Sequence, residues 1–189
     1  MSNLEIASNI FNVVSVFLAR KNNIHTWWTG IIACILFGIL FFNSNLYADS
    51  LLQLFFIGTS VMGWRNWKSG SQQSTELPIT RTNIKSLILI ITISLFLTII
   101  HGLLLRTFTN GSYPFIDSSI LMLSITAQIL LMGRKIENWY FWIVVNTISV
   151  PLYFIKDLKL TSFIYLIFLI NAVWGLKAWK KILKSNEKI

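Results

Sequence analysis

Charged side chains are scarce in this chain of 189 residues, and acidic ones are the scarcest. Asp, Glu, Lys and Arg together make up 12% of the residues, and 16 Lys and Arg against seven Asp and Glu give a net charge of +9. A soluble domain usually carries about a quarter charged residues, so the composition argues against a soluble globular protein. The basic excess alone fits either a nucleic-acid partner or a membrane protein with cationic cytoplasmic loops.

Cysteine and short functional motifs are also sparse. The single cysteine, Cys34, lies in an apolar run and cannot form an intramolecular disulfide. The chain has neither metal-ligand spacing nor a nucleotide-binding glycine loop, so we expect no metal, no cofactor and no ATP-driven transport by this chain alone. Its first residues lack the basic segment and the cleavage site of a secretory signal peptide.

Long apolar segments, by contrast, fill most of the sequence. A spanning helix needs about 20 mostly apolar residues, with roughly 17 as the lower limit. Seven segments are predicted spans, at residues 4–19, 25–42, 46–67, 84–105, 116–132, 139–155 and 158–179. The first is the least apolar, because Glu5 and Asn9 interrupt it, and an amphipathic helix on the membrane surface is the alternative there. We predict an all-α integral membrane protein with seven transmembrane helices.

The positions of the cations along the chain decide between the two interpretations of the net charge. If seven spans alternate the loops between two sides, every Lys and Arg except Arg106, Lys156 and Lys159 falls on one side. The positive-inside rule places that side, with the C-terminus, in the cytoplasm and the N-terminus outside. The basic charge then records orientation in the lipid bilayer, and we expect no nucleic-acid partner.

An internal repeat is visible when the chain is compared with itself. One common offset, which we call the repeat offset, aligns Trp27 with Trp139, Gly63 with Gly175 and Trp67 with Trp179. An offset longer by two positions aligns the Arg20-Lys21 pair with Arg134-Lys135. Three helices and one linker helix restore the orientation of the next three, so these are parallel repeats. We predict a 3+1+3 arrangement: a first triple-helix repeat at 1–68, a cytoplasmic linker and linker helix at 69–110, and a second repeat with a basic tail at 111–189.

Polar and aromatic side chains inside the spans are the candidate substrate-binding residues, because polar groups in a membrane tend to face the bundle interior. Gln53, Gln128 and Asn146 are the predicted hydrogen-bonding groups, and the predicted stacking walls are Trp64, Trp142 and Trp174. Asp117 is a predicted polar gate, with a helix-capping role as the alternative. The tryptophans nearest the span ends, Trp27, Trp67 and Trp179, are expected to be interfacial anchors.

Amides and indoles together suit one kind of ligand. Indole faces can sandwich a flat cationic ring, with a contribution of roughly 0.5–2 kcal/mol each. Carboxamides both donate and accept hydrogen bonds, so they can bind hydroxyl groups or another carboxamide. Some of the same polar residues could instead serve as hydrogen bonds between helices. The set favours a flat, electron-poor aromatic ligand that carries hydroxyl groups.

Both repeats carry a specific combination of short motifs. In the first repeat they are Leu46-Tyr47-Ala48-Asp49, Leu52-Gln53, Gly63-Trp64 and Trp67. In the second they are Asp117-Ser118, Ala127-Gln128, Arg134-Lys135, Glu137-Asn138-Trp139, Trp142, Asn146, Leu152-Tyr153 and Gly175. In these motifs the sequence resembles the PnuC family of bacterial vitamin transporters, and the resemblance implies a 3+1+3 fold related to that of the SWEET sugar transporters. It also implies uptake of nicotinamide riboside across the inner membrane by facilitated diffusion, with a cytoplasmic kinase trapping the vitamin.

Several alternatives stay open. Related family members are taken to carry thiamine or riboflavin, which are also flat ring systems, so another vitamin is possible. A membrane-embedded enzyme or scaffold subunit is the alternative of another class, although an enzyme would need a paired acid and base facing one cavity. The helix faces are compatible with a monomer or with a homo-oligomer.

Overall fold

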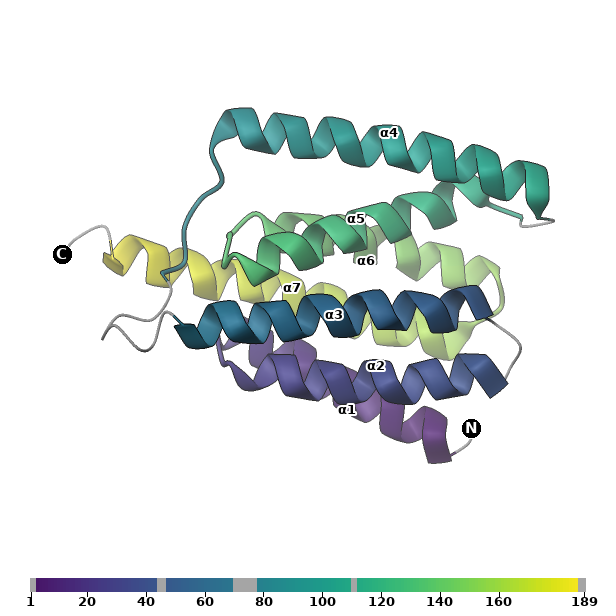
Figure 1. Ribbon diagram of the computed structural model, residues 1–189, viewed down its shortest axis with the longest axis horizontal. Helices are drawn as coiled ribbons and strands as arrows, with labels where there is room; N and C mark the ends of the chain where they lie inside the picture. Colours follow the sequence, from purple (N-terminus) through teal and green to yellow (C-terminus); the bar gives the residue numbers. More distant parts are fainter. Residues whose placement is uncertain (1–2, 44–46, 70–77, 110–111, 187–189) are drawn as a thin grey trace. The chain divides into compact units, whose positions relative to one another are not determined.

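The computed structural model describes residues 3–43, 47–69, 78–109 and 112–186, and these residues form seven helices (Figure 1). In chain order they are α1 (Asn3–Arg20), α2 (His25–Asn43), α3 (Tyr47–Ser69), α4 (Ile84–Phe108), α5 (Pro114–Met132), α6 (Asn138–Ile155) and α7 (Lys159–Asn186). The predicted all-α fold with seven helices is confirmed. Leu46, where the third span was predicted to begin, and Lys188 of the basic tail lie outside the described residues.

The helix ends agree with the predicted spans to within a few residues except at α7, which continues past Trp179 to Asn186. Four helices in the described part of the chain, α2, α4, α5 and α7, are long and apolar enough to cross a membrane by length and composition. The helices α1, α3 and α6 fall outside this set. The helix α6 carries buried polar residues, among them Asn138 and Asn146, which lower its mean hydropathy. Polar side chains in a membrane helix tend to face the bundle interior.

The chain divides into two compact units, Met1–Pro78 with Lys184–Ile189, and Ile79–Leu183. In the first unit α2 packs against both α1 and α3. Ser15 of α1 donates to the Thr26 carbonyl (2.8 Å), and the Thr26 hydroxyl donates back to the Ser15 carbonyl (2.9 Å). This reciprocal pair of hydrogen bonds fixes the position of α1 along α2.

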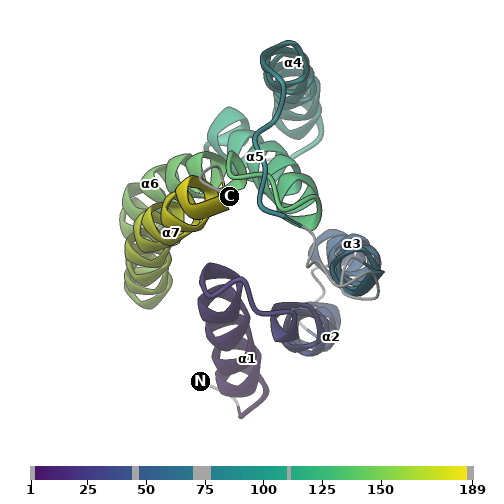
Figure 2. The same cartoon turned by 90° about the vertical axis from the view of Figure 1, so that its left-hand side faces the viewer.

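In the second unit α5 lies between α4 and α6, and it packs against both (Figures 1 and 2). Tyr153 of α6 stacks on Tyr165 of α7 with ring centroids 5.0 Å apart. Ser162 at the start of α7 donates to the Val150 carbonyl of α6 (2.7 Å). These contacts join the C-terminal half of α6 to the N-terminal half of α7.

A glycine–tryptophan contact recurs in both units at the predicted repeat offset. In the first unit the indole of Trp27 lies over Gly63, where an added Cβ would be 2.5 Å from Trp27 Cη2, and in the second Trp139 lies over Gly175 at 2.7 Å. Each indole also meets a second tryptophan edge-on, with centroids 5.2 Å apart for Trp27–Trp67 and 5.5 Å for Trp139–Trp179. Only glycine leaves room for this approach.

These tryptophans correct one expectation. Trp27, Trp67 and Trp179 were predicted as interfacial anchors, but they are 2%, 1% and 0% exposed. They are core residues of their units, buried against a neighbouring helix rather than placed at the lipid headgroups. Their burial explains why both repeats retain the pattern of Gly followed four residues later by Trp.

The turn that precedes Trp27 recurs before Trp139, at the same repeat offset. Asn22 and Arg134 both adopt the left-handed backbone conformation, with φ of 53° and 48°. The hydrogen bonds around them match as well, because Asn23 donates to Leu18 and Lys135 donates to Leu130. The structure therefore pairs Arg134 with Asn22, so the longer offset that aligned Arg20-Lys21 with Arg134-Lys135 is wrong.

A short extended segment precedes α4, and we call residues 79–83 the strap. Ile79 is buried, and Thr80 forms a parallel bridge with Lys135 in the loop between α5 and α6. The backbone amide and the hydroxyl of Thr82 both donate to Glu137 Oε2, at 2.9 and 2.8 Å. The strap therefore joins the N-terminus of α4 to a loop 55 residues further along the chain.

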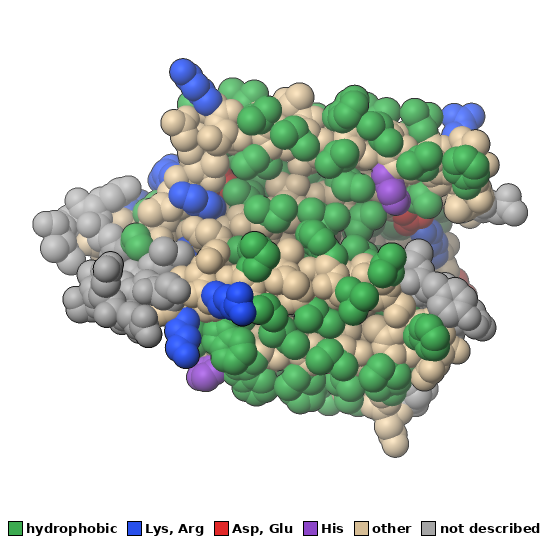
Figure 3. All heavy atoms as spheres, in the orientation of Figure 1, with side chains coloured by type: hydrophobic (Ala, Val, Ile, Leu, Met, Phe, Trp, Pro, Cys, Tyr) green, Lys and Arg blue, Asp and Glu red, His purple; other side chains and the backbone are tan. Residues whose placement is uncertain are grey.

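The helix α4 carries an apolar surface along most of its length (Figure 3). Its exposed side chains are mostly Ile, Leu or Phe, with Ile84 65%, Leu89 59% and Phe96 61% exposed. A helix with this surface is stable in hydrocarbon and would be an aggregation hazard in water.

Candidate functional site

Two of the seven predicted substrate-binding residues lie on α3 in the first unit. Gln53 is half-buried and packs over Gly38 of α2, where an added Cβ would lie 3.7 Å from the Gln53 Cβ. Its amide nitrogen donates to the Asp49 carbonyl at 3.4 Å, a long hydrogen bond that leaves the amide oxygen for other partners. Trp64 is 41% exposed and so lies on the open side of α3.

The other five lie in the second unit, and four of them, Asp117 among them, are on the neighbouring helices α5 and α6. Gln128 of α5 is half-buried, and its neighbour Ala127 belongs to an apolar cluster with Leu130 and Phe141. Trp142 of α6 packs against this cluster. Asn146, four residues after Trp142 and 3% exposed, lies on the same side of α6. Gln128, Trp142 and Asn146 thus lie on two helices that pack against each other.

One further polar residue on this part of α6 is not among the predicted site residues. Ser149 lies three residues after Asn146 and is completely buried, and its hydroxyl has no hydrogen-bond partner among the described residues. Buried polar groups are normally hydrogen-bonded, so a bare hydroxyl of this kind needs a partner from outside the described part of the chain. The spacing Trp142, Asn146, Ser149 (i, i+4, i+7) was the signal that could have identified it.

Asp117 lies far from Gln128 along the axis of α5. It is in the first turn of α5, eleven residues before Gln128, which corresponds to about 16 Å along the helix axis. Lys156, the residue that follows α6, contacts its carboxylate at 2.8 Å, and the two side chains are 28% and 33% exposed for Lys156 and Asp117. Residue 113, not Asp117, occupies the cap position of α5. The Asp117 carboxylate therefore links the start of α5 to the end of α6.

Trp174 and Asn171 lie on α7. Trp174 is 52% exposed, whereas Asn171, three residues earlier, is almost completely buried. Trp174 lies one residue before Gly175, the glycine that receives the Trp139 indole on another side of the helix. The exposed indole of Trp174 and the surface that receives Trp139 thus lie on different sides of α7.

The chemistry of these side chains suits binding better than catalysis. Within the described residues, no group of three His, Cys, Asp or Glu side chains is placed to hold a metal ion. Gln128 and Asn146 contribute one amide from each helix, Trp142 contributes an indole, and Ser149 adds a hydroxyl. Such groups can hold a neutral or cationic ring with polar substituents, and they offer no acid–base pair.

Comparisons with known proteins agree with this description. A family model described as "Nicotinamide mononucleotide transporter" matches residues 2–181. The chain is 29% identical to the nicotinamide riboside transporter PnuC of Escherichia coli (strain K12), over 95% of this chain and 85% of that protein. It is 22% identical to the riboflavin/roseoflavin transporter RibM of Streptomyces davaonensis, over 93% of this chain and 83% of that protein.

The fold also matches a solved structure. A crystal structure of the vitamin B3 transporter PnuC superposes with a TM-score of 0.77 at 24% sequence identity, and the match covers 96% of this chain and 82% of that one. This similarity supports the same helical fold in both chains.

Proposed function

Because the chain belongs to the nicotinamide mononucleotide transporter family, a family of multi-pass membrane transporters, we propose that it carries nicotinamide riboside into the bacterial cell by facilitated diffusion. A cytoplasmic kinase then phosphorylates the vitamin, and the added charge prevents its return. The protein itself needs only to bind the vitamin and to expose it alternately on the two sides of the inner membrane.

The buried polar groups of α6 are the observation that carries this proposal. Asn146 is 3% exposed and Ser149 is fully buried without a partner in the described part of the chain. Trp142 precedes them on the same side of the helix. Nicotinamide riboside offers a cationic pyridinium ring for the indole, and it offers a carboxamide and ribose hydroxyls for the amides and the serine hydroxyl.

Nicotinamide riboside is the first choice of substrate because several similar proteins, including those of Escherichia coli and Haemophilus influenzae, are named as nicotinamide riboside transporters. One similar protein is named as a riboflavin/roseoflavin transporter, which makes riboflavin the second candidate. Both molecules are flat rings that carry hydroxyl groups, so the same kinds of side chain can bind either. Thiamine is the third candidate substrate, and its binding is measured alongside that of the other two.

The proposed orientation has the N-terminus outside and the C-terminus in the cytoplasm. It rests on the placement of the cations, because all but three of the 16 Lys and Arg fall on one side of the seven spans. Two of the three exceptions, Lys156 and Lys159, make ion pairs with Asp117 and Asp157.

Binding by the purified protein tests the substrate. Nicotinamide riboside, riboflavin and thiamine are titrated in turn by calorimetry, and we expect nicotinamide riboside to bind most tightly. Asn146→Ala is expected to weaken that binding roughly tenfold or more, because a lost hydrogen bond in a buried site costs about 1–3 kcal/mol. Thr147→Ala is the matched control, since Thr147 is exposed and donates to the Ile143 carbonyl of its own helix.

Tighter binding of riboflavin than of nicotinamide riboside would overturn the substrate assignment and leave the fold intact. Equal effects of Asn146→Ala and Thr147→Ala would remove Asn146 from the site. The mechanism is tested separately in proteoliposomes. With the membrane potential held at zero, facilitated diffusion predicts that labelled vitamin reaches equal concentrations inside and outside, whether or not a proton or sodium gradient is imposed. Accumulation above the outside concentration under these conditions would refute it.

A further inference from the structure

Two adjoining cavities run between α4 and α5 in the second unit. They share the lining residues Ile90, Ile129 and Leu130, so they form one continuous groove, which we call the α4–α5 groove. One cavity has a volume of about 170 Å³ and lies towards the middle of both helices. The other, of about 420 Å³, lies at the N-terminal end of α4 beside the strap.

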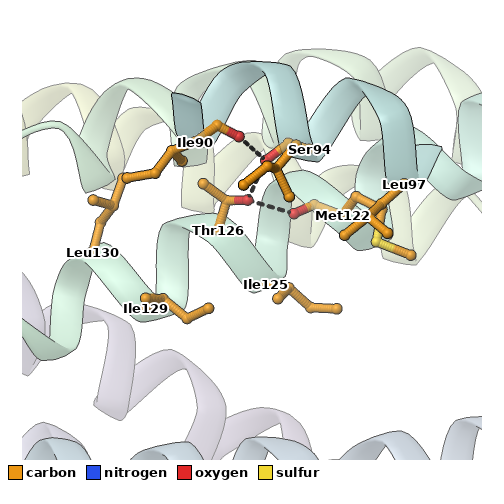
Figure 4. A pocket seen from close by; sticks show the side chains of 9 residues that line it. Ile90, Ser94, Leu97, Met122, Ile125, Thr126, Ile129 and Leu130 are labelled. Atoms are coloured by element: carbon orange, nitrogen blue, oxygen red, sulfur yellow. Dashed lines mark hydrogen bonds between the residues drawn. The ribbon is translucent and has the colours of Figure 1, made fainter. Parts of the chain in front are cut away.

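The inner cavity is lined by Ile, Leu and Met side chains (Figure 4). Its polar groups are Ser94 and Thr126, whose hydroxyls lie 2.7 Å apart and hydrogen-bond to each other across the two helices. The lining residues Ile93 and Ile129 are 48% and 52% exposed, so the cavity opens to the surroundings of the helices. A cavity of about 150 Å³ with this lining holds a benzene-sized apolar group. In a membrane, the surroundings that enter it are hydrocarbon.

The end of the groove beside the strap is polar and basic. Thr82, Asn83 and Ser86 line it on one side, and Lys135 lines it on the other. Lys135 is held there by a hydrogen bond of 2.8 Å from its ammonium group to the Thr80 hydroxyl. Its position in the cavity is therefore fixed by the strap and is not that of a freely moving surface lysine.

Other charges near this end leave it positive. Arg81 and Lys85 are exposed and lie in the chain beside the lining residues Thr82 and Ser86. The carboxylate that the strap contacts, on Glu137, is 8% exposed, and one of its oxygens already accepts both hydrogen bonds from Thr82. Two exposed cations and the anchored Lys135 thus outnumber this buried carboxylate.

We propose that the α4–α5 groove is a binding site for an anionic phospholipid. One acyl chain lies in the apolar cavity, and the phosphate of the headgroup lies against Lys135 with the Ser86 hydroxyl as a second donor. The groove supplies both features that such a lipid requires, an apolar slot open to the bilayer and a cation at its end near the headgroups. Basic pockets between membrane helices recognise anionic headgroups in this way.

Lipid titration of the purified, delipidated full chain tests the proposal. Dioleoylphosphatidylglycerol and dioleoylphosphatidylcholine are added separately, and binding is followed by native mass spectrometry and by the thermal unfolding midpoint. We expect preferential binding of, and stabilisation by, phosphatidylglycerol. Lys135→Gln is expected to weaken phosphatidylglycerol binding about fivefold, the value for the loss of one lysine at an anionic surface.

Control variants separate the cation from the structure around it. Lys181→Gln removes an exposed lysine of α7 that does not line the groove, and its binding should match that of the unaltered protein. Thr80→Val removes the hydroxyl that anchors Lys135 and keeps the charge, so most of the lipid preference should remain. Ile129→Trp fills the groove without changing any charge and should abolish the preference, whereas Leu95→Trp, on an exposed part of α4 outside the groove, should not.

Three outcomes would overturn the proposal. In the first, Lys135→Gln and Lys181→Gln affect phosphatidylglycerol binding equally, so the lipid does not bind to Lys135 in particular. In the second, inorganic phosphate alone gives the full stabilisation and Ile129→Trp does not reduce it, so the polar end binds a free anion. In the third, Ile129→Trp changes the mass of the assembly regardless of lipid, so a second copy of the chain occupies the groove.

Discussion

Adding one methyl group at Gly175 tests whether the glycine–tryptophan contact holds α6 and α7 together. The Cβ of Gly175→Ala would lie 2.7 Å from Trp139 Cη2, whereas carbon atoms pack best at about 3.5–4.0 Å. The indole or the helix must therefore move by roughly 1 Å. Neither moves easily, because Trp139 is 2% exposed and meets Trp179 edge-on.

The expected magnitude follows from two opposing effects. Overpacking a well-filled core costs about 1–3 kcal/mol, and the upper part of this range applies because the obstructing ring is rigid and buried. Alanine recovers up to about 1 kcal/mol through its higher helix propensity. We expect Gly175→Ala to lower the free energy of unfolding by about 2 kcal/mol.

Gly58→Ala is the matched control, because an added Cβ there meets nothing within 4 Å. The same substitution is expected to be neutral or to stabilise by up to about 1 kcal/mol. Both variants are unfolded at equilibrium in mixed micelles with increasing denaturing detergent. Trp139→Phe supplies a second test, since the smaller ring should make room for the new methyl group and give favourable coupling in the double variant. Equal stabilities of Gly175→Ala and Gly58→Ala, or the absence of coupling, would refute the reasoning.

Three further predictions test single contacts. Glu137→Ala is expected to lower the free energy of unfolding by about 1.5–3 kcal/mol, because it leaves two donors of the strap without their charged acceptor. Glu137→Gln keeps an oxygen acceptor and should lower the free energy of unfolding less. Amide hydrogen exchange in the strap measures the effect of both variants. Ser94→Ala and Thr126→Ala in a double-mutant cycle should give a coupling energy near 0.6 kcal/mol, at most about 1.7; a value of zero would contradict the hydrogen bond between α4 and α5. Asp117→Asn and Lys156→Gln should couple by less than about 1 kcal/mol, since both side chains are about a third exposed; this coupling should fall as salt is added, and a salt-independent value would argue against an ion pair.

The helices and the repeat could be predicted because their signals are local or periodic in the sequence. Apolar runs of spanning length identified every helix, and the ends differed little except at α7, whose last turns carry lysines that hydropathy excludes. The repeat offset found between tryptophans recurs as the same buried contact in both units. The extra Arg-Lys match at the longer offset failed because two adjacent cations are common near helix ends, whereas the left-handed turn fixes Asn22 to Arg134.

The environment of individual side chains was harder to predict. Trp27, Trp67 and Trp179 stand near span ends, where indoles usually meet the headgroups, yet all three are buried. The glycine four residues before each of the two later tryptophans was the physical clue, since a missing side chain on one helix is room for a large one from another. Ser149 was missed because a serine in an apolar run has little weight in the sequence, and only its burial without a partner makes it notable.

By itself, the sequence determined that this is a membrane protein of seven helices, that its chain repeats, and that its cations gather in the loops and at the ends of the apolar segments. These properties follow from the partition of each segment between water and hydrocarbon, which depends on composition and spacing within about 20 residues. Only the tertiary structure decided that Thr82 bonds to Glu137 across 55 residues, that Lys156 pairs with Asp117, and that α4 and α5 leave a groove with a lysine at one end. Such contacts depend on the rotation and depth of one helix against another, and an apolar surface of Ile and Leu does not specify either of them.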